Sequence, residues 1–135
     1  MIVNLDGEGN IISQKAFGTV KVQSDGLDVC STLDGGYAVS SLIVEDDKES
    51  SVILKFNSAN KIEWKKVIKK GIVYSIASTM DGGLILCVSE DTKDKFLKNI
   101  FVVRLNPPRH VLWERIYTEY EIYVLLNTDI IETKK

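Results

Sequence analysis

One motif occurs twice in this chain, and its repetition limits the architectures that the chain can adopt. Residues 32–36, Thr-Leu-Asp-Gly-Gly, return 47 positions later as residues 79–83, Thr-Met-Asp-Gly-Gly. A tryptophan that follows a strand-like segment also recurs, as Trp64 and, 49 positions later, as Trp113. A period of this length is typical of one supersecondary unit that is copied along a chain, each copy burying its apolar face against the next.

The segments between these motifs predict strands. Short runs rich in Val, Ile, Leu, Tyr and Trp alternate with clusters of Gly, Asp and Asn, and no helical period of useful length is present. We expect an all-β protein of about twelve strands. They are predicted at residues 2–5, 11–17, 28–33, 37–43, 51–57, 62–68, 73–80, 84–90, 99–106, 111–117, 122–127 and 129–133.

The repeated glycines suit tight hairpins, because glycine supplies the positive φ that the favoured hairpin turns require. Asp34 and Asp81 each precede such a glycine pair. An aspartate in a turn bonds to its own following backbone, so we assign both a structural role rather than a paired catalytic one.

The residues around the first motif resemble a known family. Ser31-Thr32-Leu33-Asp34-Gly35-Gly36-Tyr37-Ala38-Val39, followed by Leu54-Lys55-Phe56-Asn57 and Trp64-Lys65-Lys66, resembles the Asp-Gly-Gly-Tyr β-propeller repeat of bacterial and archaeal proteins, whose function is mostly unassigned. The resemblance covers most of the chain and implies four-stranded antiparallel propeller blades. Three departures are Ser13 in place of the tryptophan, Leu84 in place of the tyrosine, and a last copy at 124–131 without a glycine pair.

The frame of the repeat predicts about three blades per chain. It implies a half-blade at 1–17, blades at 27–68 and 72–117, and a half-blade at 121–135. Propellers use roughly four to eight blades, so we expect oligomerisation to complete the ring. A head-to-tail homodimer of six blades is favoured; a nine-bladed trimer and a piece of a longer propeller remain alternatives.

The charge distribution is compatible with this head-to-tail arrangement. Residues 1–50 carry nine acidic residues and three lysines, which gives −6, and residues 51–135 carry fourteen basic and ten acidic residues, which gives +4. The sum is the net charge of −2. Opposite charge on the two halves favours contact between one chain's head and another's tail.

Other features bear on location. No apolar stretch approaches the roughly 20 residues that span a bilayer, and the amino terminus has no basic leader with a long apolar core. Cys30 and Cys87 lie inside apolar segments and are interpreted as buried small hydrophobes. We therefore expect a cytoplasmic protein without membrane contact.

Signals for catalysis are weak. His110 is the only histidine, and the chain has no phosphate-binding glycine loop, nucleophile elbow or Cys-x-x-Cys pair. We expect no catalytic residues, no cofactor and no metal. The acidic stretches 45–47 and 90–94 are interpreted as solvated loops, with metal or ligand contact as the alternative.

A basic cluster lies beside Trp64. Its lysines are Lys65, Lys66, Lys69 and Lys70. Lysines on the outer strand of a blade discourage pairing with other strands, which we prefer to an anionic partner or nucleic acid.

These observations favour a non-catalytic binding or scaffolding module with an unknown small-molecule or protein ligand. An enzyme with an axial active site between blades and a coat-type assembly protein are the alternatives. The expected binding surface comprises loops within 18–27, 44–50, 69–72, 90–98 and 117–121. Its candidate residues are Asp46, Asp47, Lys48, Lys69, Lys70, Asp91, Lys93 and Asp94.

Overall fold

The computed structural model describes residues 1–17, 23–92, 97–107 and 110–121, and these form an all-β fold without helices. The prediction of an all-β protein is confirmed. The strands are β1 (Ile2–Leu5), β2 (Ile11–Lys15), β3 (Gln23–Ser31), β4 (Tyr37–Glu45), β5 (Lys48–Phe56), β6 (Ile62–Ile68), β7 (Ile72–Ser78), β8 (Leu84–Asp91), β9 (Leu97–Leu105) and β10 (Val111–Glu121).

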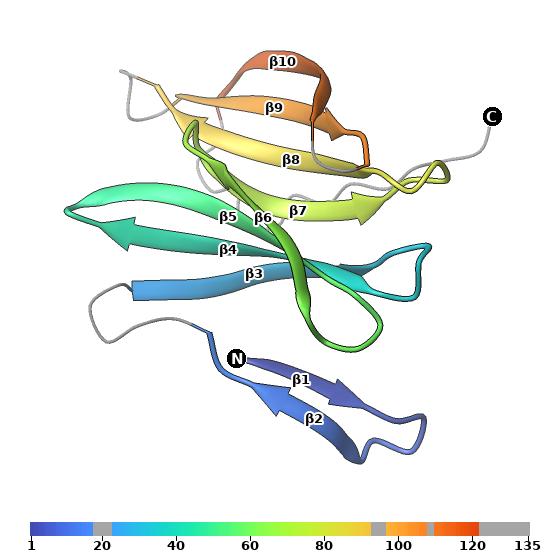
Figure 1. The fold of residues 1–135 in the computed structure, drawn as a ribbon. Helices are drawn as coiled ribbons and strands as arrows, with labels where there is room; N and C mark the ends of the chain where they lie inside the picture. The colour runs from blue at the N-terminus through green and yellow to red at the C-terminus, as the bar shows by residue number, and fades with distance from the viewer. Residues whose placement is uncertain (18–22, 93–96, 108–109, 122–135) are drawn as a thin grey trace.

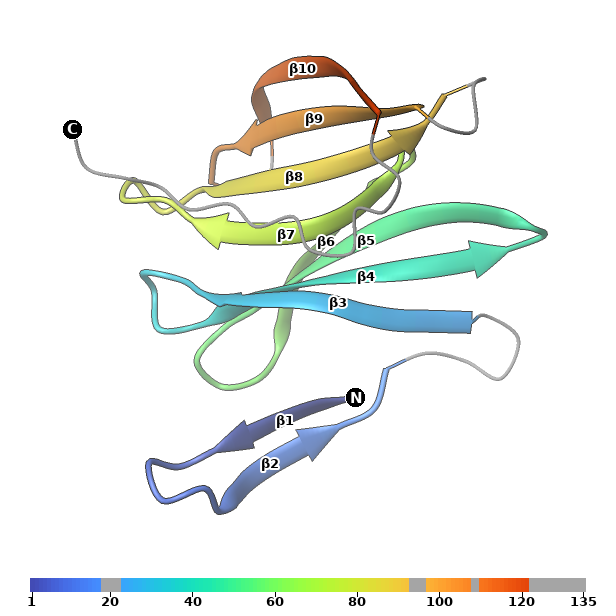
Figure 2. The same ribbon diagram turned by 180° about the vertical axis from the view of Figure 1, so that it is seen from behind.

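The strands form three antiparallel sheets that follow one another along the chain. β1 and β2 form a two-stranded sheet, which we call the hairpin. β3 to β6 form the first sheet and β7 to β10 the second sheet, and in both each strand pairs with its neighbours in sequence. The three sheets are stacked in chain order (Figures 1 and 2). The two last predicted strands, 122–127 and 129–133, lie outside the described residues.

Several strands are longer than predicted, and three predicted loops are wrong in extent. β3 begins at Gln23, inside the predicted loop 18–27, and β10 continues to Glu121, through the predicted loop 117–121. We expected a loop at 44–50, but β4 continues to Glu45 and β5 begins at Lys48. Only Asp46 and Asp47 remain between them, with φ of 50° and 59°. Positive φ at both central residues is the mark of the type I′ hairpin turn, and aspartate tolerates that conformation better than most residues.

The repeated glycine motif closes the first hairpin of each four-stranded sheet. The amide of Thr32 donates to the carbonyl of Gly36 at 3.0 Å, and Asp34 Oδ1 accepts the hydroxyl of Thr32 at 2.6 Å and the amide of Gly36 at 3.1 Å. Asp81 makes the corresponding bonds with Thr79 and Gly83. The structural role predicted for the two aspartates is confirmed.

The main core lies between the two four-stranded sheets. The second sheet contributes most of its buried apolar side chains, and the first sheet contributes Ala38 and Ile53, with Trp64, Ile68 and Cys30 packed against the cluster. The contributors from the second sheet are Val73, Ile76, Leu84, Leu86, Val88, Phe101, Val103 and Leu105. β7, an edge strand of the second sheet, contacts β3, β4 and β5. The apolar face of each four-stranded sheet is thus buried by its stacking on the other sheet, as expected of a repeat protein.

Polar contacts join β3 to β7 within this interface. Oδ2 of Asp28 accepts the amide of Ile76 at 2.8 Å and the hydroxyl of Ser75 at 3.1 Å. A bulge precedes Asp28 in β3, and the equivalent bulge precedes Ser75, 47 positions later, in β7. The hydroxyl of Ser51 also accepts the amide of Val73 at 2.8 Å. These contacts fix how the two sheets are placed against each other.

The hairpin contacts the first sheet through a small set of side chains. The amide group of Asn4 donates to Asn60 Oδ1 at 2.9 Å and to the hydroxyl of Ser13 at 3.0 Å. Phe17, which follows β2, packs edge-on against Phe56 with ring centroids 5.2 Å apart. The hairpin therefore lies on the face of the first sheet that is opposite to the second sheet (Figure 1).

Candidate functional site

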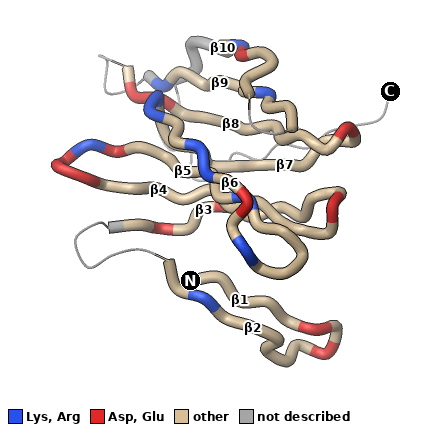
Figure 3. Tube along the Cα trace, in the orientation of Figure 1, with Lys and Arg blue, Asp and Glu red and all other residues tan. Residues whose placement is uncertain are grey.

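The strands have two ends, and the turns at these ends differ in character. One end carries the glycine turns 32–36 and 79–83 together with the turns 6–10 and 57–60; we call it the glycine-turn end. The opposite end carries the β4–β5 turn, the β6–β7 link and the end of β8. Acidic residues gather at the β4–β5 turn and basic residues along β6 (Figure 3). Each end contains a hollow.

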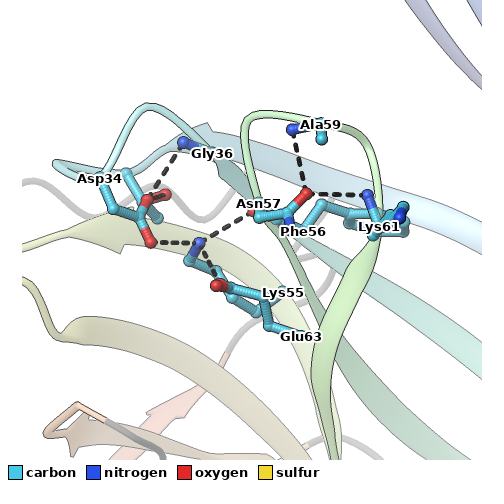
Figure 4. A network of polar contacts seen from close by, with 9 residues as sticks. Asp34, Gly36, Lys55, Phe56, Asn57, Ala59, Lys61 and Glu63 are labelled. Atoms are coloured by element: carbon cyan, nitrogen blue, oxygen red, sulfur yellow. Dashed lines mark hydrogen bonds and ion pairs between the residues drawn. The ribbon is translucent and has the colours of Figure 1, made fainter.

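A buried lysine organises the glycine-turn end of the first sheet. Lys55 Nζ lies 2.8 Å from Asp34 Oδ2, 2.8 Å from Glu63 Oε2 and 2.8 Å from the carbonyl oxygen of Phe56 (Figure 4). Burial lowers the pKa of the Lys55 ammonium, but the hydrogen bonds and charges of Asp34 and Glu63 outweigh this effect and the pKa is raised. Lys55 therefore stays charged, and its three hydrogens all have acceptors.

The aspartates of both glycine turns are stabilised in their charged form. The hydrogen bond from Lys55, followed by that from Thr32, holds the pKa of Asp34 well below its ordinary value of 3.8. In the second sheet Arg104 replaces Lys55: its guanidinium pairs with Asp81 and donates to the carbonyl of Leu105 at 2.8 Å. Hydrogen bonds from Thr79 and then Arg104 lower the pKa of Asp81 to about 2.

The hollow at this end lies between the two sheets and has a volume of about 230 Å³. Lys55, Asp34, Glu63 and Trp64 line it on the first sheet. The second sheet contributes Gly82, Gly83, Leu84, Leu105 and the turn residues Asn106 and Pro107. Because its charged groups are already paired with one another, this hollow has a structural explanation.

The predicted binding residues lie at the opposite end, but most of them are not brought together. Asp46 and Asp47 form the exposed tip of the β4–β5 turn, and Lys48 is exposed opposite Glu45 in the strand ladder. Lys69 is exposed in the β6–β7 link. Two further predicted residues, Lys93 and Asp94, lie outside the described residues.

Lys70 has a structural contact at this end. Its ammonium lies 3.3 Å from Oε1 of Glu114 in β10 and 4.2 Å from the ring centroid of Phe101 in β9. A cation over an aromatic face is attracted by the ring quadrupole. Lys70 thus ties the β6–β7 link, which we predicted as part of the binding surface, to β9 and β10 of the second sheet.

Asp91 does line a hollow at this end, of about 200 Å³, which we call the acidic hollow. Its lining residues are Glu49, Gly71, Ile72, Tyr74, Ser89, Glu90, Asp91 and Lys98. They come from β5, the β6–β7 link, β7, β8 and β9, so the acidic hollow spans both four-stranded sheets. Within it the ammonium of Lys98 pairs with the carboxylate of Asp91.

Gly71 and Tyr74 shape the acidic hollow. Gly71 has φ of +87°, and a Cβ there would overlap the carbonyl of Ser89, so both the conformation and the space require glycine. Tyr74 is the extra residue of the bulge in β7 between Val73 and Ser75. Bulges redirect side chains and are common beside functional sites.

Sequence reasoning found part of the acidic hollow. Glu49, Gly71, Glu90, Asp91 and Lys98 all fall within the predicted loop ranges. Of these, only Asp91 was named as a candidate, because charge runs drew attention to the neighbouring residues. Tyr74 and Ser89 lie in predicted strands and were missed. Tyr74 corresponds to Leu27, 47 positions earlier, and this change from an aliphatic to an aromatic residue is the signal that could have identified Tyr74.

The remaining candidates for chemistry lie apart from the acidic hollow. Burial, with the charge of Asp28 adding to it, raises the pKa of the Cys30 thiol to about 11, and burial also raises the pKa of Cys87. His110 is exposed, and its amide donates to Asn106 Oδ1 at 3.0 Å. Among the described residues no group of three His, Cys, Asp or Glu side chains is placed to hold a metal ion. The same residues contain no helix long and apolar enough to cross a membrane.

Neither a scan against protein-family models nor a search of curated proteins finds a match to this sequence. The function is therefore inferred from the geometry of the chain itself.

Proposed function

We propose that this chain is a non-catalytic binding or scaffolding module of β-propeller architecture, in which the acidic hollow receives the ligand. Stacked four-stranded antiparallel sheets with a repeat of 47 to 49 residues support the propeller architecture, because each propeller blade is such a sheet. A ring would then need a second copy of the chain.

We choose the acidic hollow as the site because the two ends differ in how far their residues recur between the copies of the repeat. At the glycine-turn end the threonine, the aspartate, the glycine pair and a basic residue recur in both sheets, and their polar groups satisfy one another. Glu63, whose equivalent is Leu112, is paired with Lys55. In the acidic hollow the copies differ: Glu49 corresponds to Lys98, 49 positions later, and the stretch 89–91, Ser-Glu-Asp, corresponds to 42–44, Leu-Ile-Val. Residues needed by the fold recur in each copy, so residues that differ between copies are better suited to recognition.

The chemistry of the acidic hollow suggests the kind of ligand. Glu49, Glu90 and Asp91 contribute three negative charges and Lys98 one positive charge, which gives −2. This potential favours a positively charged group. Sites for drug-sized ligands have volumes of about 300 to 1,000 Å³, so a hollow of about 200 Å³ suits a small group such as the ammonium or guanidinium of a side chain. A basic peptide or protein segment is the partner that combines both properties.

Titration monitored by amide NMR spectra tests this proposal. The probes are agmatine, which carries a guanidinium of side-chain size, and succinate, which carries the opposite charge. We expect agmatine to shift the amide signals of Gly71, Tyr74 and Ser89, and succinate to leave them unchanged.

Two variants localise the effect. Glu90→Gln removes one charge from the acidic hollow and is expected to weaken agmatine binding. Asp46→Asn removes a charge from the exposed β4–β5 turn and should bind as the parent does, because Asp46 is not a lining residue. Equal weakening in both variants, or shifts that spread over the whole surface, would mean that the acidic hollow is not the binding site.

A further inference from the structure

The stack of three sheets has two end faces, one on the second sheet and one on the hairpin. Side chains on these faces are more exposed than side chains at the same repeat positions inside the stack. Trp64 is packed against the core beneath the second sheet. Trp113, at the same repeat position in the second sheet, is 41% exposed. Lys66 and Ile68 are likewise half-buried, whereas the equivalent Arg115 and Tyr117 are exposed. The face of the second sheet that points away from the first sheet thus carries residues at the positions that make the contact between the two sheets. These residues are more exposed than their equivalents in the first sheet.

The opposite face of the stack shows the reciprocal difference. Val103 and Leu105 are buried in the contact between the two sheets, at 5% and 1% exposure. Val3 and Leu5 occupy the same repeat positions in the hairpin, since residues 3–5 correspond to 103–105, and they are 38% and 55% exposed. The hairpin therefore presents the side chains that would pack on a face such as that of Trp113.

A groove of about 600 Å³ lies beside the hairpin. Met1 and residues 2–4 of β1 line it on one side, and β3 and β4 of the first sheet line it on the other, including Leu27, Val29, Tyr37 and Val39. Val29 is 59% exposed, whereas Ile76, its equivalent in the second sheet, is 4% exposed. Of the described strands only β2 pairs with β1. The groove is therefore where the inner two strands of a four-stranded sheet would lie.

We propose that the occupant of these surfaces is a second copy of this chain, docked head to tail. Val3 and Leu5 of one copy pack on the face around Trp113 and Tyr117 of the other, as Val103 and Leu105 pack on the face around Trp64 and Ile68 within one chain. The second copy also covers the groove, including the edge of β1 that pairs with no described strand. This inference rests on the propeller architecture proposed above and specifies its interface.

One observation supports a copy of the chain rather than an unrelated partner. The two end faces complement each other position by position, because they are the two halves of one contact that the chain already makes internally.

Mass in solution is the test, measured by light scattering behind a sizing column over a hundredfold dilution. We expect the parent to have twice the 15.1 kDa chain mass. Leu5→Glu and Trp113→Glu should each weaken association by about tenfold or more, since buried aromatic and apolar anchors dominate interfaces. Leu33→Ser is the matched control: Leu33 and its equivalent Met80 are both exposed, so the sheet-to-sheet contact does not bury this position.

Mixing the two weakened variants identifies the geometry. In a head-to-tail pair, Leu5→Glu and Trp113→Glu can form one contact in which both faces are intact, so the mixture should regain a species of two chains. If the parent instead forms assemblies of more than two chains, and both variants reduce their mass, the same head-to-tail contact exists in an open assembly rather than a closed ring. A parent that stays at 15.1 kDa, or a mixture that regains no association, would overturn the inference.

The mass measurement and the agmatine titration can fail independently of each other. All lining residues of the acidic hollow come from one chain, so a monomeric Trp113→Glu variant should still bind agmatine if the binding proposal is right. Circular dichroism of each variant checks that it is folded, which the exposure of both sites favours.

Discussion

The ammonium nitrogen of Lys55 lies 2.8 Å from Oδ2 of Asp34, on the inner side of the glycine turn that joins β3 to β4. The same nitrogen would lie only 2.8 Å from a Cβ at residue 36. Arg104 and Asp81 repeat this arrangement at Gly83 in the second sheet. The aspartate, the second glycine and the basic residue of the repeat are therefore one structural unit, although the basic residue follows the aspartate by 21 positions in the first sheet and by 23 in the second.

The glycines of this unit should differ in their tolerance of substitution. At Gly36 a Cβ would overlap the carbonyl oxygen of Phe56, so Gly36→Ala is expected to lower the free energy of unfolding by about 2 to 4 kcal/mol. Gly35→Ala meets no close neighbour but has φ of +78°, and should cost about 1 kcal/mol. Urea unfolding measures both. Gly7→Ala, with no atom within 4 Å, is the control and should be nearly neutral; a Gly36→Ala variant as stable as this control would contradict the close approach.

Removal of Lys55 should destabilise the first sheet. Lys55→Met keeps the length of the side chain but leaves Asp34 and Glu63 without their cation and the Phe56 carbonyl without its donor. Both carboxylates are partly exposed, so we expect a loss of about 1 to 2 kcal/mol rather than the larger cost of a fully buried pair. Lys65→Met, on the exposed face of β6, serves as the control in the same urea experiment. Equal stability of the two variants would show that the Lys55 contacts contribute little.

The carboxylate of Asp28 should stabilise the stacking of the two sheets. Asp28→Ala leaves the amide of Ile76 without its acceptor in the interface, with an expected cost of about 1 to 3 kcal/mol. Asp28→Asn retains one oxygen that accepts the same bond and should cost less. Hydrogen exchange at the Ile76 amide gives a local measurement: protection should fall in Asp28→Ala more than at amides within β4. Unchanged protection at Ile76 would argue against this contact.

Stability should fall in acid because of the turn aspartates. Their pKa values are lower in the folded chain than the ordinary value of 3.8, and that of Asp81 is about 2. A lowered folded pKa stabilises the fold above the unfolded pKa, and this stabilisation is lost as the pH falls from about 4 through about 2. Denaturation at pH 2.5 to 6 should show a shallower acid dependence in Asp34→Asn/Asp81→Asn than in the parent. Asp46→Asn is the control, and a double variant with the parent's pH dependence would refute the assignment.

Much of the fold could be predicted from local sequence. The ten described strands correspond to the first ten predicted ones, because alternating apolar residues and glycine turns specify strands and hairpins over a few positions. Strand ends were less predictable. Asp46 and Asp47 suggested a long solvated loop, yet the ladder between β4 and β5 continues to within two residues of the turn. Pairing across the sheet supplied backbone partners that outweighed the local polarity.

The candidate site was less predictable, because it depends on how two sheets stack. Charge runs pointed to Lys70, but the proximity of Phe101 and Glu114 gives that residue a structural contact. Glu49 lay within a predicted loop and Tyr74 within a predicted strand, but neither was named as a candidate, since they come together with Asp91 only in the folded arrangement of β5, β7 and β8.

The sequence by itself determined the repeat, the all-β character and the turn chemistry, since these depend on backbone preferences of a few consecutive residues. Only the tertiary structure decided which copies of a repeated residue are covered. Trp64 and Trp113 occupy equivalent positions, yet one packs against the core and the other is exposed. Exposure depends on the neighbouring sheet, and a residue's place in a repeat does not specify whether that neighbour is present.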